Sequence, residues 1–122
     1  MKDIITGLIS VIIPVHNRSG MLREAVASVQ EQDYPSLEII IVDDGSSDDT
    51  PGVMSELRDR DPRIAIRSRP QAGPGAARET GRLIAAGEFI QYLDSDDLLL
   101  EGKLSRQVER LRQNPRADLC MS

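Results

Sequence analysis

Three short apolar runs stand out along the chain, each bounded by polar residues. They cover residues 10–15, 37–42 and 89–93. The first two are nearly continuous and rich in β-branched side chains, which is typical of strands buried on both faces of a sheet. A weaker run at 64–66 predicts another strand, and the apolar residues at 117–121 predict the beginning of a fifth.

Helical patterns fill the intervals between these runs. The first predicted helix ends near Gln32 and has apolar residues three and four positions apart, at Leu22, Ala25, Val26 and Val29. A second begins with Thr50 as its N-cap, directly before a proline. A third covers 76–86 with Gly87 as its C-cap, and a fourth covers about 101–114.

The alternation of strands and helices predicts an α/β fold. We expect one domain over residues 1–122, with a doubly wound, mostly parallel sheet and right-handed crossovers. Ligands bind such sheets beyond the carboxyl ends of the strands, at the point where strand order reverses. This places the segments 15–18, 43–44 and 94–96 along one rim.

An acidic cluster, Asp94-Ser95-Asp96-Asp97, follows the apolar run 89–93. Carboxylates crowded at the end of a buried strand repel one another unless a cation or a donor-rich loop neutralises them. Oxygen ligands on a short turn suit Mg²⁺ or Mn²⁺, whose open positions accept substrate phosphate oxygens. The alternative is a solvated turn that caps the next helix, but capping needs only one acid.

Three other positions are candidates for ligand contacts. Asp43 and Asp44 end the second strand, where a carboxylate accepts ribose or base hydrogen bonds, although turns rich in Asp and Gly are also common there. Arg78 lies in the first turn of the third helix, where a guanidinium and amide N–H groups can hold an anion jointly. The single histidine, His16, predicts no catalytic role.

Composition restricts the functional classes. Hydrophobic residues make up 39% and charged residues 29% of the chain, which excludes a wholly disordered protein. The net charge of −5 argues against a general nucleic-acid surface. The single cysteine, Cys120, cannot form an internal disulfide, and the sequence shows neither a membrane-spanning run nor a signal peptide pattern, so we expect a cytoplasmic protein.

The motifs together resemble a known family. In order and spacing, the chain is similar to the donor-binding half of family 2 glycosyltransferases with the Rossmann-like GT-A fold. The resemblance rests on segments that span nearly the whole chain, at 11–18, 40–48, 75–78 and 87–97. It implies transfer of a sugar from a nucleoside diphosphate sugar, most simply a UDP-sugar, with inversion and with Mn²⁺ or Mg²⁺ as cofactor.

The resemblance also implies residue roles. Asp94-Ser95-Asp96 matches the D-x-D motif of the family, in which Asp96 ligates the cation and Asp94 contacts the ribose or the metal shell. Asp44 would accept a hydrogen bond from a uracil-type base. The full set of implied nucleotide-sugar contacts is Pro14, Val15, His16, Asn17, Arg18, Asp43, Asp44, Gly45, Gly75, Arg78, Asp94 and Ser95.

The resemblance further implies what the chain lacks. Inverting transfer needs a carboxylate base, and the family carries it after the fifth strand, so we expect a piece of a longer enzyme, ending at the start of that strand, that binds donor without a base of its own. The intact enzyme would be cytoplasmic or bound peripherally to a membrane. An exposed apolar edge at 119–121 predicts self-association.

Two alternatives stay open at this point. A strand ending in Asp-x-Asp is also typical of haloacid-dehalogenase-like phosphatases, although there the pair usually follows the first strand and here that strand ends in Pro14-Val15-His16. A non-catalytic α/β module is the second alternative, but it gives no reason for carboxylates to collect on one rim.

Overall fold

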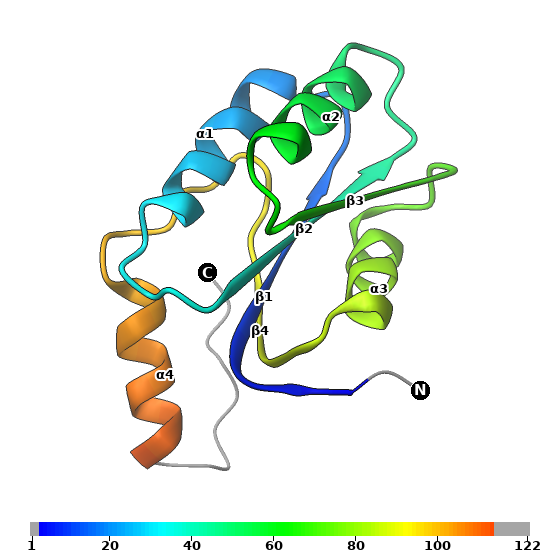
Figure 1. Cartoon of the computed structure of the whole chain (residues 1–122). Coiled ribbons are helices and arrows are strands. Elements are labelled where there is room, and N and C mark those ends of the chain that lie inside the picture. The colour runs from blue at the N-terminus through cyan, green and yellow to red at the C-terminus, as the bar shows by residue number, and fades with distance from the viewer. Residues whose placement is uncertain (1–2, 114–122) are drawn as a thin grey trace.

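A computed structural model describes residues 3–113 (Figure 1). Strands and helices alternate along the chain, as the sequence pattern predicts. The elements are β1 (Ile5–Val15), α1 (Ser19–Gln30), β2 (Leu37–Asp44), α2 (Thr50–Arg60), β3 (Ile64–Arg69), α3 (Pro74–Ile84), β4 (Gly87–Tyr92) and α4 (Lys103–Gln113).

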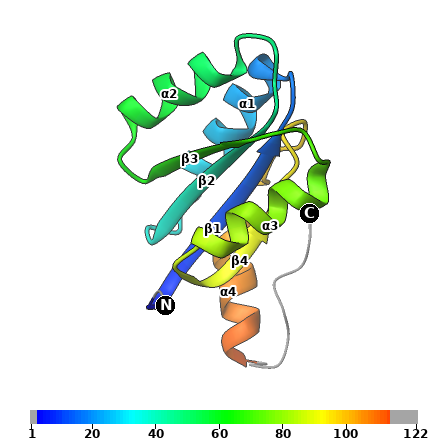
Figure 2. The same cartoon turned by 90° about the vertical axis from the view of Figure 1, so that its right-hand side faces the viewer.

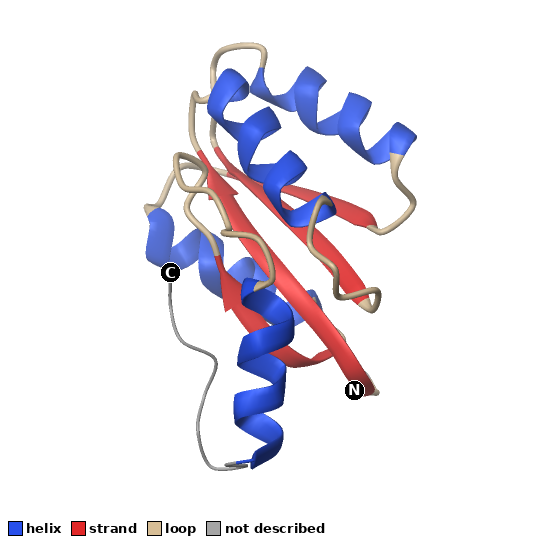
Figure 3. Cartoon of the chain, turned by 90° about the vertical axis from the view of Figure 1, so that its left-hand side faces the viewer, coloured by secondary structure: helices blue, strands red, loops and turns tan. Residues whose placement is uncertain are grey.

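The four strands form one sheet in the order β3-β2-β1-β4, and every neighbouring pair is parallel. Helix α3 covers one face, while α1 and α2 lie on the other (Figures 1 and 2). Figure 3 views the sheet from the side of α1 and α4, with these helices in front of the strands. The prediction of a doubly wound, parallel α/β fold is confirmed.

Successive side chains of β1 point to opposite faces of the sheet, and both faces are covered by helices, which explains why the apolar run is continuous. Ile9, Val11 and Ile13 pack into the cluster beneath α1, α2 and α4, whereas Ile12 packs into the cluster beneath α3. All four side chains are completely buried. Burying one such side chain stabilises the fold by about 1.5–3 kcal/mol, so both helical layers are held by the same central strand.

Gly87 is not the C-cap of α3 but the first residue of β4, because Ala85 occupies the cap position with extended backbone. A Cβ atom on Gly87 would lie 2.6 Å from the Ser10 hydroxyl oxygen, so this glycine is required for close strand approach. Its N–H donates to Ser10 Oγ at 2.9 Å, and that hydroxyl donates to Glu38 Oε2 at 2.6 Å. The C-cap prediction is wrong because the constraint comes from a distant strand.

Thr50 is not the N-cap of α2 but its first residue, with Asp49 at the cap position. The N–H of Thr50 donates to Asp48 Oδ1 at 2.9 Å, which draws the chain into the helix one residue early. Strand β1 likewise begins at Ile5, five residues before the apolar run, because the Ile5 N–H pairs with Ala86 O at 2.8 Å.

The predicted fifth strand at 117–121 and Cys120 lie outside the described residues. Within residues 3–113, no helix has the length and apolar character that crossing a membrane requires.

Candidate functional site

The carboxyl ends of β1, β2 and β4 meet at one edge of the sheet, since all three strands run in the same direction. A cavity of about 270 Å³ opens there. It brings together most of the predicted site residues and adds Pro74, which sequence reasoning missed. Its lining residues are Pro14, Val15, His16, Arg18, Asp44, Pro74, Arg78, Asp94, Ser95 and Asp96.

Asp44, at the end of β2, is buried and holds the loop that leads into α3. Its Oδ1 accepts the Ala72 N–H at 2.9 Å, and its Oδ2 accepts the Gly73 N–H at 3.0 Å. Arg69 Nε lies 3.8 Å from Oδ1 and adds a cation. These donors offset the cost of burying a charge.

Asp43 and Gly45 shape the turn beside Asp44 and do not line the cavity. Asp43 is buried, and its Oδ1 accepts the Ser46 N–H at 3.0 Å. Gly45 has φ of 74° and lies so near Gln71 that a Cβ atom would sit 2.8 Å from the Gln71 nitrogen. Only glycine satisfies both the positive φ and the close approach.

Asn17 ties the loop after β1 to the loop after β2. It has φ of 52°, and its Oδ1 accepts the Ser47 N–H at 2.8 Å. The neighbouring His16 places Nδ1 2.9 Å from the Asp44 carbonyl oxygen. Since a carbonyl only accepts, Nδ1 is the donor in this hydrogen bond.

The acidic turn, defined as residues 94–97, follows β4 directly. The N–H of Asp97 donates to Asp94 O at 2.9 Å, which closes the turn. The carboxylates of Asp94, Asp96 and Asp97 are exposed, and one oxygen of each lies within 4.8 Å of the others. Oxygens bound to one Mg²⁺ lie about 3–4 Å apart at its bond length of about 2.1 Å, and rotation of exposed side chains closes the difference. The residues therefore fit a hard divalent cation.

Arg78 reaches the acidic turn from α3. Its Nη2 lies 2.9 Å from Asp94 Oδ1, the one ion pair found for this turn among residues 3–113. Its Nε is buried without a hydrogen-bond partner in the same part of the chain, so the guanidinium has a donor to spare. Gly75, from the first turn of α3, does not line the cavity.

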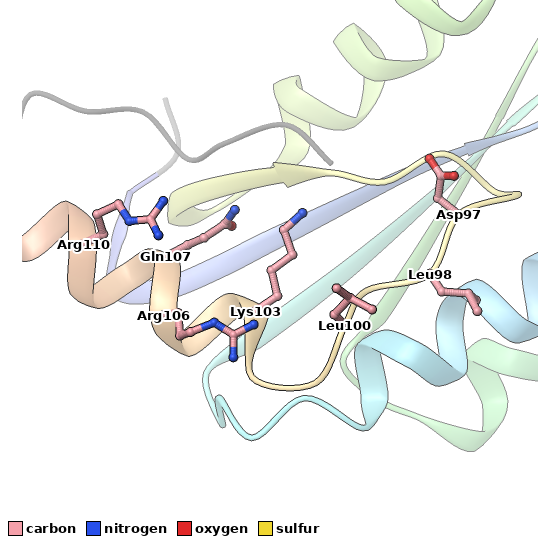
Figure 4. A pocket seen from close by; sticks show the side chains of 7 residues that line it. All are labelled: Asp97, Leu98, Leu100, Lys103, Arg106, Gln107 and Arg110. Carbon is pink, nitrogen blue, oxygen red and sulfur yellow. The ribbon is translucent and has the colours of Figure 1, made fainter.

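A larger hollow of about 570 Å³ lies beside the acidic turn, between the segment after it and α4 (Figure 4). Sequence reasoning missed this hollow, although its three basic side chains lie three and four positions apart on α4, at Lys103, Arg106 and Arg110. Leu98 and Leu100 are exposed at its rim, at 58% and 72%. Its lining residues are Asp97, Leu98, Leu100, Lys103, Arg106, Gln107 and Arg110.

A family model described as glycosyl transferase family 2 matches residues 10–122. The chain belongs to this family. The resemblance drawn from the motifs is thereby confirmed, and the family match removes the ground for the phosphatase alternative.

Two curated glucosyltransferases are similar to this chain. A GalNAc(5)-diNAcBac-PP-undecaprenol β-1,3-glucosyltransferase of Campylobacter jejuni is 41% identical over 86% of this chain and 35% of that protein. A UDP-Glc:α-D-GlcNAc-diphosphoundecaprenol β-1,3-glucosyltransferase of Escherichia coli is 35% identical over 88% of this chain and 42% of that protein. The chain thus spans less than half the length of each of these two relatives.

Solved structures agree with the family fold. TarS of S. aureus in complex with UDP has a TM-score of 0.80 and 28% identity, over 88% of this chain and 33% of that chain. The mannosyltransferase PcManGT of Pyrobaculum calidifontis, in complex with GDP-Man and Mn²⁺, has a TM-score of 0.78 and 28% identity, over 84% of this chain and 32% of that chain.

Proposed function

We propose that this chain forms the donor-binding part of an enzyme that transfers a sugar from a nucleoside diphosphate sugar. The observation that carries the proposal is the acidic turn, where three exposed carboxylates converge next to Arg78 at the mouth of the rim cavity. A nucleoside diphosphate combines a polar base with a charged diphosphate, and the cavity combines polar loops with groups for a cation and an anion.

Asp94 and Asp96 are the proposed ligands of Mn²⁺ or Mg²⁺. When bound, the cation supplies Lewis-acid stabilisation for the charge on the departing nucleoside diphosphate. Arg78 would approach the same phosphates with the guanidinium donor that has no partner among the described residues. Ser95 lines the cavity between the two aspartates.

The loops after β1 and β2 are the proposed base site. Both carboxylate oxygens of Asp44 already accept a backbone N–H, yet each retains a second lone pair that can accept from a base. Pro14, Val15, His16 and Arg18 line the same cavity from the end of β1 and the loop after it. Asp43, Gly45 and Asn17 do not line the cavity and would act by fixing the loops beside it.

The donor and acceptor proposals draw on the relatives. The Escherichia coli relative is named for UDP-Glc, and both named glucosyltransferases carry a diphosphoundecaprenol-linked acceptor in their names. We therefore place UDP-glucose first among the donors to test, with an acceptor linked to a polyprenol diphosphate. Such an acceptor would bring a cytoplasmic enzyme to the membrane surface.

Inverting transfer is the proposed stereochemistry, with a carboxylate that takes the proton of the acceptor hydroxyl. We assign that base to the part of the related proteins that this chain does not span. The chain would then bind donor while transferring sugar slowly or not at all.

Calorimetric titration tests the proposal. UDP, UDP-glucose and GDP-mannose are each titrated with and without Mn²⁺, and Mn²⁺ is titrated alone. We expect Mn²⁺ to strengthen nucleotide binding, and Asp96→Asn to weaken Mn²⁺ binding at least about tenfold, which is about 1.4 kcal/mol.

The matched control is Asp59→Asn, which removes the same charge from an exposed position on α2. It should leave binding unchanged. A nucleotide affinity that is the same with and without Mn²⁺, and the same in Asp96→Asn as in the wild type, would overturn the metal assignment. Absence of binding for all the nucleotides tested would overturn the proposed function.

A further inference from the structure

The segment that follows the acidic turn, residues 98–102, belongs to no helix or strand, and side chains of α1 and its end fix its path. Gln32 donates from Nε2 to Leu100 O at 2.9 Å and accepts the Leu104 N–H at Oε1 at 3.2 Å. Ser28 accepts the Leu99 N–H at Oγ at 3.0 Å. Each of these bonds joins residues about 70 positions apart.

Gln32 is built into this position. The residue is only 9% exposed, and its Nε2 also lies 3.3 Å from the carbonyl oxygen of Ser28, near the end of α1. Ser28 Oγ in turn donates to Ala25 O at 2.7 Å. Both side chains are therefore fixed by α1 before they meet the segment, and a buried amide with all its bonds made is a specific anchor.

Burial of apolar side chains holds the segment in the same place as the hydrogen bonds of Ser28 and Gln32 do. Leu99 in the segment and Leu104 in the first turn of α4 are buried, at 5% and 0% exposure, whereas Leu98 and Leu100 are exposed. Two buried leucines set the depth of the segment, and the Ser28 and Gln32 bonds set its register. Without these bonds, the N–H groups of Leu99 and Leu104 would lose their acceptors, and Leu100 O would keep only the Lys103 N–H.

The acidic turn is therefore held at both ends. On the near side, the Leu93 N–H donates to Ile12 O at 3.0 Å, which ties the chain to β1. On the far side, Leu99 lies two residues beyond Asp97 and is tied to α1 by Ser28. The three carboxylates between these ties repel one another, so a free end would let the turn spread.

We infer that Ser28 and Gln32 are positioning residues that keep the carboxylates of the acidic turn close enough to share one divalent cation. The inference rests on the proposed function. These side chains touch neither ion nor substrate. They act by holding the backbone of the turn, so that the coordination geometry is formed before the cation arrives.

The test measures Mn²⁺ affinity by calorimetry in variants that keep every carboxylate. We expect Gln32→Leu, which keeps the approximate volume but removes the amide, to raise the Mn²⁺ dissociation constant about tenfold. Ser28→Ala should raise it about threefold. Ser28→Thr keeps the hydroxyl, and the hollow of about 240 Å³ beside Ser28 has room for the added methyl, so its affinity should match the wild type.

Two controls separate positioning from general stability. Ser105→Ala removes an exposed bond between α4 and Asp33, 2.5 Å long, which leaves the anchor intact. Ile64→Val thins the core at β3, away from the turn, and lowers the stability of the fold without touching the segment. Both should bind Mn²⁺ as the wild type does at a temperature where all variants are folded.

Amide hydrogen exchange supplies a readout that needs no metal. Exchange at Asp97 and Leu99 should accelerate in Gln32→Leu, while amides in β1 and β2 keep their protection. Unchanged Mn²⁺ affinity in Gln32→Leu, or an equal loss in Ile64→Val, would overturn the inference alone. Absence of Mn²⁺ binding by the wild-type chain would overturn the metal assignment and this inference with it.

Discussion

Two groups of aspartates lie at the same edge of the sheet and are used in opposite ways. Asp43 and Asp44 at the end of β2 are buried and accept backbone N–H groups. Asp94, Asp96 and Asp97 after β4 are exposed, and Arg78 is the one cation paired with them among residues 3–113. The same side chain is thus part of the framework in one loop and available to a ligand in the next.

The number of nearby donors decides between these uses. A buried carboxylate is tolerated where amides and cations replace its lost hydration, and it then fixes the loop that supplies them. An exposed carboxylate keeps its hydration and most of its lone pairs, so it remains free to bind a cation. The comparison predicts that substitutions of the buried aspartates of β2 lower the stability of the fold, whatever they do to the proposed base site, whereas substitutions of the exposed aspartates after β4 change cation binding with little effect on stability.

The largest expected effect on stability is that of Asp44→Ala. It leaves the Ala72 and Gly73 N–H groups without their acceptor, and we expect the free energy of unfolding to fall by about 3 kcal/mol. Urea unfolding followed by circular dichroism measures the change. Asp59→Ala on α2 is the control and should differ from wild type by less than about 0.5 kcal/mol. An unchanged urea midpoint in Asp44→Ala would contradict the conclusion that this buried aspartate belongs to the framework of the fold.

A second effect extends the comparison to a carboxylate outside the site. The Arg63 side chain hydrogen-bonds to Asp61, with Nη2 2.9 Å from Oδ2, and holds the pKa of that carboxyl well below its usual range, against the opposing effect of burial. A depressed pKa in the folded state contributes stability that is present above the unfolded pKa of about 3.9. That stability is lost as the pH falls through the folded value.

We therefore expect Asp61→Asn to cost about 1–2 kcal/mol at pH 7 and progressively less below pH 4. Urea unfolding at pH 7, 4 and 3 measures the difference between variant and wild type. A difference that stays constant across this range would show that the ion pair does not contribute to acid stability.

The smallest expected effect is that of Asp97→Asn in the acidic turn. The substitution relieves repulsion between exposed charges, so the free energy of unfolding should rise by no more than about 0.5 kcal/mol, and less at high salt. Urea unfolding in low and high salt measures it. A loss of more than 1 kcal/mol would mean that this carboxylate also belongs to the framework.

The fold followed from local patterns because its two central strands, β1 and β2, are buried on both faces. Such strands produce continuous apolar runs, and the helices between them have apolar residues three and four positions apart. The parallel α/β topology and the shared rim could therefore be predicted from the sequence. The acidic cluster could also be identified from the sequence, because adjacent carboxylates repel one another unless a cation or hydrogen-bond donors offset the repulsion.

The rest depended on contacts between distant segments. That Asp44 binds the Ala72 and Gly73 amides, across 28 and 29 positions, depends on the path of a loop that no local pattern fixes. Gly87 had the local signature of a helix cap, but its role is set by Ser10, 77 positions away. Gln32 gave no signal for the same reason.

The Ser10 hydroxyl has a consequence for how the chain tolerates change. It links β1 to Glu38 and Gly87 at the amino ends of β2 and β4, whereas the ligand cavity opens at the carboxyl ends. One end of the sheet is cross-linked by the hydrogen bonds of the Ser10 hydroxyl, and the other end is formed by the loops that line the cavity. Substitutions in the loops of the open end can therefore change ligand contacts while the hydrogen bonds of Ser10 preserve the alignment of the strands.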